Sequence, residues 1–166
     1  IHFHPSQIED PQENLEFVEI YNDDSIVVDL SGHRFSSGLD FTFPDRTFLP
    51  ARSYLVVCRN VEAVTAHYGI DNAIGDFSGR LDNTGEWIGL VNPMGSTVAE
   101  TRYRNGGEGT LGADAGAAAD GTGLTLAIAS FFADTRNPDT WVRSSQLGGT
   151  PGTPNFPAPA PNDREI

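Results

Sequence analysis

The chain has 166 residues, of which 38% are hydrophobic and 20% charged, and this suits one globular domain with its own core. Ten basic residues stand against 23 acidic ones, so the net charge is −13 and most of the surface repels phosphate backbones and anionic bilayers. We therefore expect neither nucleic-acid binding nor membrane insertion. The single cysteine, Cys58, excludes a disulfide within the chain, and its apolar neighbours favour an inert core thiol.

The first part of the chain alternates short apolar runs with polar turns, which is typical of strands joined by turns. Aromatic and β-branched residues are frequent in these runs and favour strands over helices. Phe41 and Phe43 lie two residues apart, so they should share one face of their strand. Strands are predicted here over residues 15–21, 26–30, 34–35, 40–43 and 53–59.

One short helix is predicted from Asn60 to Tyr68, because Asn60 can cap its first turn and Gly69 can stop its last. We expect this helix to fill a crossover between strands. Residues 105–123 are rich in Gly and Ala and are expected to form a long mobile loop. Within it, residues 107–112 fit G-x-G-x-x-G, but no βαβ unit follows, so a loop is favoured over a nucleotide site.

A hairpin is predicted from residues 86–91 and 97–104. The turn at residues 92–96 has Pro second and Gly fourth, which suits a type I turn. Later strands are predicted over residues 124–128 and 140–142, and the chain then becomes rich in Pro, Gly and Ala.

The strand spacing and the shortage of helices predict an all-β antiparallel sandwich with one short crossover helix. We assign residues 1–155 to this domain and residues 156–166 to a Pro/Ala-rich linker or strand-donating tail. Two facing sheets should bury four large side chains between them: Phe17, Phe43, Val56 and Ile88.

Several short motifs follow one another in a fixed order over nearly all of residues 1–155. They are Glu16-Phe17-Val18-Glu19-Ile20-Tyr21-Asn22, Val28-Asp29-Leu30-Ser31-Gly32, Asp40-Phe41-Thr42-Phe43-Pro44, Leu81-Asp82-Asn83-Thr84-Gly85-Glu86 and Gly149-Thr150-Pro151-Gly152-Thr153-Pro154-Asn155. In order and spacing, these motifs resemble the lamin-tail domain family. The resemblance implies an immunoglobulin-like sandwich without catalytic residues. Bacterial members of that family are usually parts of secreted or surface-attached modular proteins, and the family has no agreed ligand.

Two sets of residues are candidate metal ligands. His2 and His4 would project from one face of a strand as half a zinc site, with Glu9 or Asp10 as a third ligand. The alternative is a half-paired sheet edge without metal. Acidic residues in turns have the hard oxygen ligands that calcium prefers, although ordinary turn chemistry is the favoured explanation for them. The calcium candidates are Asp23, Asp24 and Asp82.

The sequence therefore predicts a non-catalytic structural or interaction module of a secreted or cell-surface bacterial protein, possessing no cofactor, in an assembly joined head to tail. Its partners would be other proteins or further copies that add at sheet edges. The alternative is an accessory domain of a secreted hydrolase that binds carbohydrate or calcium. The tail either is a linker or lends an edge strand to a neighbouring copy, so the residues expected at such contacts are Ile1, Phe3, Arg164 and Ile166.

Overall fold

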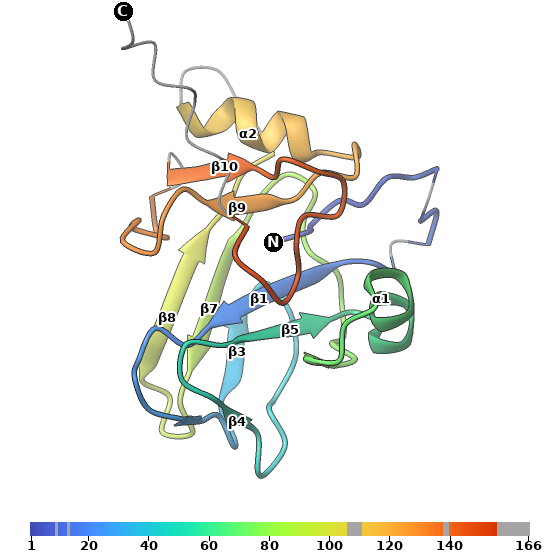
Figure 1. The fold of residues 1–166 in the computed structure, drawn as a ribbon. Helices are drawn as coiled ribbons and strands as arrows, with labels where there is room; N and C mark the ends of the chain where they lie inside the picture. Colours follow the sequence, from blue (N-terminus) through green and yellow to red (C-terminus); the bar gives the residue numbers. More distant parts are fainter. Residues whose placement is uncertain (9, 13, 106–110, 138–139, 156–166) are drawn as a thin grey trace, which may run out of the picture.

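The structure is a computed structural model that describes residues 1–8, 10–12, 14–105, 111–137 and 140–155. These residues form ten strands and two helices, so the chain is mainly β (Figure 1). The strands are β1 (Phe17–Tyr21), β2 (Val28–Asp29), β3 (Arg34–Ser37), β4 (Phe48–Leu49), β5 (Tyr54–Cys58), β6 (Ala73–Ile74), β7 (Trp87–Val91), β8 (Thr97–Arg102), β9 (Leu126–Ile128) and β10 (Trp141–Arg143). The helices are α1 (Val61–Tyr68) and α2 (Leu111–Ala119).

Two three-stranded sheets form the body of the sandwich. The first has the order β1-β5-β6, in which β1 is antiparallel and β6 is parallel to the central β5. The second has the order β3-β7-β8 and is antiparallel throughout. Two shorter pairs, β2 with β4 and β9 with β10, complete the strands, and β9 and β10 lie across one end of the body. The expected all-β antiparallel sandwich is confirmed.

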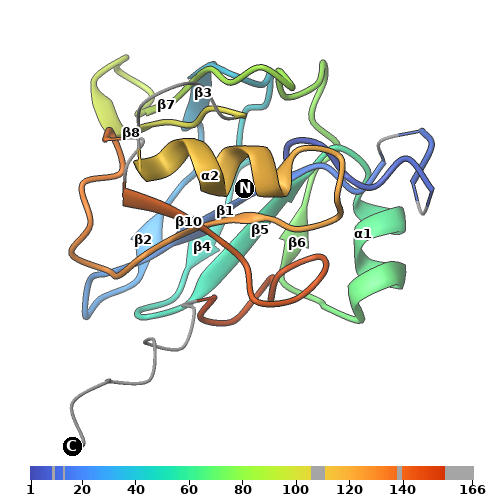
Figure 2. The same ribbon diagram turned by 90° about the horizontal axis from the view of Figure 1, so that it is seen from above.

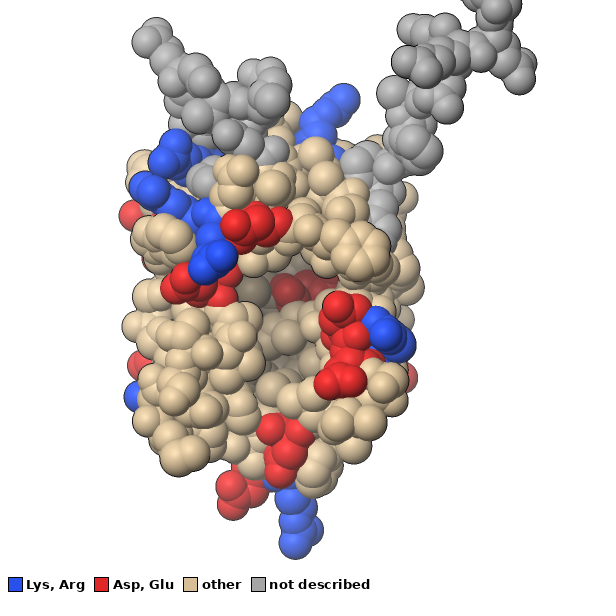
Figure 3. Space-filling model, turned by 90° about the vertical axis from the view of Figure 1, so that its left-hand side faces the viewer, with Lys and Arg blue, Asp and Glu red and all other residues tan. Residues whose placement is uncertain are grey.

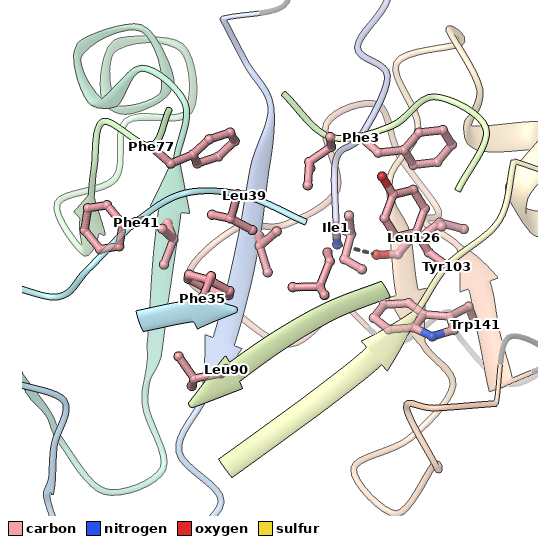
Figure 4. Packing of buried hydrophobic residues seen from close by; sticks show 14 of the residues in the cluster. Ile1, Phe3, Phe35, Leu39, Phe41, Phe77, Leu90, Tyr103, Leu126 and Trp141 are labelled. Carbon is pink, nitrogen blue, oxygen red and sulfur yellow. Dashed lines mark hydrogen bonds between the residues drawn. The ribbon is translucent and has the colours of Figure 1, made fainter. Parts of the chain in front are cut away.

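The main core lies between the two sheets, where alternate side chains of facing strands meet. Val18 and Val57 come from the first sheet, and Ile88 and Leu90 come from the second. Phe43 adds a ring that is only 1% exposed. Figure 4 shows how the rings and aliphatic side chains of this cluster fill the interior, including Phe3, Phe35, Phe77, Tyr103, Leu126 and Trp141.

A second, smaller core lies on the other face of the first sheet, beneath α1. Phe17, Val56 and Cys58 point to this face and pack with Val64 of the helix. The prediction that Phe17 and Val56 lie between the two sheets is therefore wrong. Side chains alternate along a strand. Because the Val18 side chain points to the main core, the side chains next to it in β1 point to the opposite face.

Helix α1 confirms its sequence prediction. The Asn60 side chain accepts a hydrogen bond from the Ala63 N–H at 2.9 Å, and Gly69 ends the helix with φ 67°. The helix connects β5 to the parallel β6, and such a pair requires a crossover. Figures 1 and 2 place it beside these two strands at one edge of the molecule.

Residues 105–123 were predicted to form a loop, and this prediction is wrong because α2 lies within them. The prediction of a single helix is therefore also wrong. The sequence of α2, LGADAGAAA, is rich in the strongest helix former, and this offsets the cost of its glycines. Ala115 and Ala119 are buried, and the helix packs against β9 and β10 (Figure 2). Residues 107–110 of the G-x-G-x-x-G segment lie outside the described residues, as do residues 156–166.

The predicted hairpin is confirmed as β7 and β8. The Gly95 N–H donates to the Asn92 carbonyl at 2.9 Å, which closes the expected four-residue turn. Residues 40–43 do not form the strand that was predicted for them. Their backbone makes only isolated bridges, although Phe41 and Phe43 do lie together, with ring centroids 5.1 Å apart.

The first residues of the chain join β9 to β1. Ile1 exchanges two backbone hydrogen bonds with Leu126, both 2.8 Å long, and one of them is drawn in Figure 4. His2 exchanges two with Phe17, at 2.9 and 3.2 Å. One extended segment therefore fits between β9 and β1 and hydrogen-bonds to each in turn.

Candidate functional site

A cleft of about 310 Å³ opens between β1, β8 and β9. Its floor is apolar and belongs to the main core: Val18, Ile20, Phe35, Ile88, Leu90 and Trp141. Its acidic lining consists of Glu19, Asp23 and Glu100. Figure 3 shows the opening as a hollow with acidic side chains inside it and at its margin. Its volume is at the lower end of the range of ligand sites.

Strand β1 hydrogen-bonds to β5 through its even-numbered residues. The Asn22 N–H donates to the Ser53 carbonyl, and the Arg59 N–H donates to the Glu16 carbonyl, both at 3.0 Å. Backbone groups alternate in direction along an antiparallel strand, so the odd-numbered residues of β1 present their N–H and C=O groups to the opposite side. That side is the cleft.

Among the residues that the structure describes, only one of these odd-numbered residues has a backbone partner on the cleft side. Phe17 is paired with His2 there. Beyond this pair, the backbone groups of Glu19 and Tyr21 make no hydrogen bond on that side with any described residue. Strand β1 therefore has an open edge along the cleft.

Strand β9 faces the cleft in the same way. The Ser144 N–H donates to the Thr125 carbonyl at 2.8 Å, and the Ala129 N–H donates to the Thr140 carbonyl at 3.1 Å. These bonds show that odd-numbered residues in and beside β9 hydrogen-bond to β10. The backbone N–H and C=O of Ile128 therefore point the other way, toward the cleft. The cleft is consequently bounded by two open strand edges, one on each side.

Two titratable groups stand on the outer side of β1 at the cleft. Burial raises the pKa of Glu19 to about 7, although its Oε1 accepts a hydrogen bond from the Gly152 N–H at 2.5 Å. Burial and the nearby Glu19 carboxylate raise the pKa of Tyr54 to about 12. The Tyr54 hydroxyl is buried without a hydrogen-bond partner among the described residues. A hydrogen-bond donor that entered the cleft would pair with the Glu19 carboxylate.

The two predicted zinc-ligating histidines are used within the fold. His2 is 2% exposed, its Nδ1 lies 3.4 Å from the Tyr68 hydroxyl, and burial lowers its pKa to about 3. His4 pairs with Asp120 through its Nδ1. Asp10 accepts a hydrogen bond from the Leu15 N–H at 2.6 Å, and Glu9 lies outside the described residues.

The calcium candidates occupy separate turns. Asp23 pairs with Arg52, and Asp24 accepts from the Ser25 N–H at 2.7 Å. Two hydrogen bonds from Thr84, each 2.7 Å long, lower the pKa of Asp82. Within the part of the chain that the structure describes, no three His, Cys, Asp or Glu residues lie close enough together to hold a metal ion.

The residues predicted for contacts with other chains divide into two pairs. Ile1 is 8% exposed and Phe3 is fully buried, so both side chains belong to the protein's own core. Arg164 and Ile166 lie outside the described residues.

Burial raises the pKa of the Cys58 thiol to about 12, which disfavours the reactive thiolate.

Comparison with known proteins assigns the family. A model of the Lamin Tail Domain family matches residues 6–105. The chain belongs to the lamin-tail domain family. No curated protein and no solved structure gives a match. Lamin-tail domains have an immunoglobulin-like fold without enzymatic activity and serve as structural and interaction domains, and the mainly antiparallel sheets of this chain agree with that fold.

Sequence reasoning did not find the cleft of this lamin-tail domain. The residues that define it are Glu19, Tyr21 and Ile128, all in strands that were predicted. One signal was present, since Glu19 interrupts an apolar run where a buried strand would carry an apolar residue.

None of the helices in the described ranges has the length and apolar character to cross a bilayer.

Proposed function

We propose that this protein is a non-catalytic interaction module of a secreted or cell-surface bacterial protein, one that joins its parent protein to other proteins or to further copies. The observation that carries the proposal is its membership in a family of interaction domains. The net charge of −13 supports protein partners over nucleic acid or membrane, because a negative surface repels both nucleic acid and anionic lipid.

The surface offers contacts of the kind that this function requires. Three large apolar side chains are exposed at the short β2–β4 pair: Phe48 of β4 is 56% exposed, and Ile26 and Val27, which precede β2, are 64% and 56% exposed. Exposed apolar side chains that lie together mark protein contacts more often than isolated ones do.

Sedimentation velocity over a wide range of protein concentration tests this proposal. We expect reversible association, and Phe48→Lys should weaken it. Thr97→Lys, which adds the same charge at an exposed position on β8, is the control. A protein that stays monomeric at every concentration and gains thermal stability only with calcium would instead support the accessory calcium-binding domain. A gain only with oligosaccharide would support the carbohydrate-binding alternative.

A further inference from the structure

The sheet β3-β7-β8 turns one face to the main core and the other to solvent. Ile88 and Leu90 of the central strand β7 point to the core, so Trp87 and Gly89 point outward. Trp87 is 44% exposed, although folded proteins usually cover most of a tryptophan. Figure 2 shows this sheet along one side of the molecule. The outer face of the sheet therefore presents an aromatic ring to solvent.

Arg102 of β8 holds this ring from the neighbouring strand. The two residues lie directly opposite each other, and the guanidinium carbon of Arg102 is 5.5 Å from the centroid of the Trp87 ring. Arg102 forms no ion pair with a carboxylate of the described residues. Glu100, two residues away on the same strand, lies instead 4.0 Å from Arg136. The N–H groups of the Arg102 guanidinium are thus placed beside the ring without a carboxylate to occupy them.

A hollow lined by hydroxyl groups lies next to the ring, above Gly89. The register of β3 shifts between Phe35 and Ser37, and this bulge brings two serines over one glycine. A Cβ at Gly89 would lie 2.7 Å from the Ser36 Oγ and 3.2 Å from the Ser37 Oγ, and nothing else among the described residues beyond its chain neighbours comes within 4 Å of it. The Ser36 hydroxyl donates to the Gly89 carbonyl at 3.3 Å and keeps its lone pairs for other donors.

The dimensions of this face follow from the geometry of a sheet. Trp87 and Gly89 are two residues apart, which is about 7 Å along the strand, and β3 and β8 each lie about 5 Å to the side of β7. The ring, the guanidinium and the two hydroxyls therefore surround an area close to that of one pyranose ring with its hydroxyl groups.

We propose that this outer face binds one ring of a neutral, glucose-configured oligosaccharide. A pyranose whose hydroxyls are all equatorial carries C–H groups on both faces, and these C–H groups pack on the face of an aromatic ring such as Trp87. Its hydroxyls lie around the rim, where they can accept from the Arg102 guanidinium and exchange hydrogen bonds with Ser36 and Ser37. The net charge of −13 disfavours acidic glycans. A protein partner is disfavoured because a single aromatic side chain offers little of the area that a stable interface buries.

This site adds a ligand to the interaction function proposed above and does not depend on it. The site is built on β3, β7 and β8, whereas the exposed apolar side chains that we assign to protein contacts lie at the β2–β4 pair. Sugar binding by a protein that stays monomeric would support the site and remove the association, and association without sugar binding would do the reverse.

The test is a titration of the full chain, labelled with ¹⁵N, with cellopentaose. The indole N–H signal of Trp87 should shift and saturate, with half of the change at about 1 mM for a contact of this size. The Trp141 indole N–H donates to the Thr135 carbonyl at 3.2 Å, and this residue is 8% exposed, so its signal should not move. Sorbitol, an acyclic polyol without a flat C–H face, should leave both signals unchanged.

Two pairs of variants assign the binding to this face. Trp87→Ala should weaken binding by about tenfold or more, as judged from the Ser36 and Ser37 amide signals, whereas Phe132→Ala removes a 97% exposed ring elsewhere and should have no effect. Arg102→Gln should weaken binding by about fivefold or more. Its control is Arg34→Gln, because Arg34 lies opposite Val91, four residues and about 13 Å along β7 from Trp87. An unchanged Trp141 signal shows that each variant is folded.

Four results would overturn the site. They are no shift of the Trp87 signal at about 20 mM cellopentaose, an equal shift with sorbitol, a shift of Trp141 without one of Trp87, and undiminished binding by Trp87→Ala. A shift of the Trp87 signal with a hexaglutamate peptide but not with cellopentaose would also overturn it, because the face would then be a contact for an acidic protein.

Discussion

The carboxyl group of Glu19 should make the stability of this protein fall as the pH rises. The folded state raises the pKa of Glu19 from 4.5 to about 7, mainly because the group is buried. Between these two pH values the folded protein keeps a proton that the unfolded chain has lost. Raising the pH therefore removes stability in this window, and the loss is complete above pH 7.

The substitution Glu19→Gln removes this dependence with little change of shape. The amide oxygen of glutamine can still accept the hydrogen bond from Gly152, which measures 2.5 Å in the structure. A shift of one pKa unit corresponds to about 1.4 kcal/mol, and some solvent reaches this side chain through the cleft. We therefore expect the free energy of unfolding of the wild type, relative to the variant, to fall by about 2 kcal/mol between pH 5 and pH 8.

Urea unfolding of both proteins at pH 5, 6, 7 and 8 measures this difference directly. The comparison cancels the contribution of His2, whose lowered pKa of about 3 acts in the opposite direction in both proteins. Glu100→Gln, a carboxylate change at the exposed margin of the same cleft, is the control and should leave the pH dependence of the wild type unchanged. A constant difference between wild type and Glu19→Gln across this pH range would refute the reasoning.

Three further comparisons test the fold by urea unfolding. Tyr103→Phe should cost about 1–3 kcal/mol, because the buried Tyr103 hydroxyl lies within hydrogen-bond distance of the Asp82 carbonyl at 2.8 Å and the Glu86 carboxyl at 3.0 Å. Tyr54→Phe should cost less than about 0.5 kcal/mol because its hydroxyl has no partner among the described residues, and equal costs would contradict this. Gly85→Ala should destabilise the protein by about 2 kcal/mol more than Gly95→Ala. Both glycines have positive φ, but only a Cβ at Gly85 would lie 2.6 Å from backbone atoms, those of Tyr103 and Arg104. Equal losses of stability would show that the backbone around Gly85 shifts to make room for the methyl group. Asn60→Ala should cost about 1 kcal/mol by removing the α1 cap, and an unchanged midpoint would show that the cap contributes nothing.

Local signals explain what could be predicted from the sequence. The cap and stop of α1 are Asn60 and Gly69, and the turn of the main hairpin has its Gly at position 95. Each feature depends on residues within a few positions of one another, so a single sequence is enough to recognise it. The motifs of the lamin-tail domain supplied the rest of the fold, since their order implied a sandwich that composition alone could not specify.

Tertiary contacts explain what was missed. Helix α2 has two glycines, and its burial against β9 and β10 is not visible in its own sequence. The cleft depends on Ile1 and Leu126, which are 125 residues apart in sequence yet exchange backbone hydrogen bonds. Sequence periodicity specifies which face of a strand is apolar, but it carries no information about which edge of the strand is left unpaired.

Hydrogen exchange of the protein, followed by NMR, tests the central claim that β1 pairs with β5 along one edge and, beyond Phe17, has no backbone partner among the described residues along the other. The account predicts an alternating pattern along this strand: slow exchange at Val18 and Ile20, and exchange faster by about 100-fold or more at Glu19 and Tyr21. Uniformly slow exchange of all four amides would show that both edges are paired, and uniformly fast exchange would show that β1 is not a stable strand of the sandwich. Either result would contradict the account.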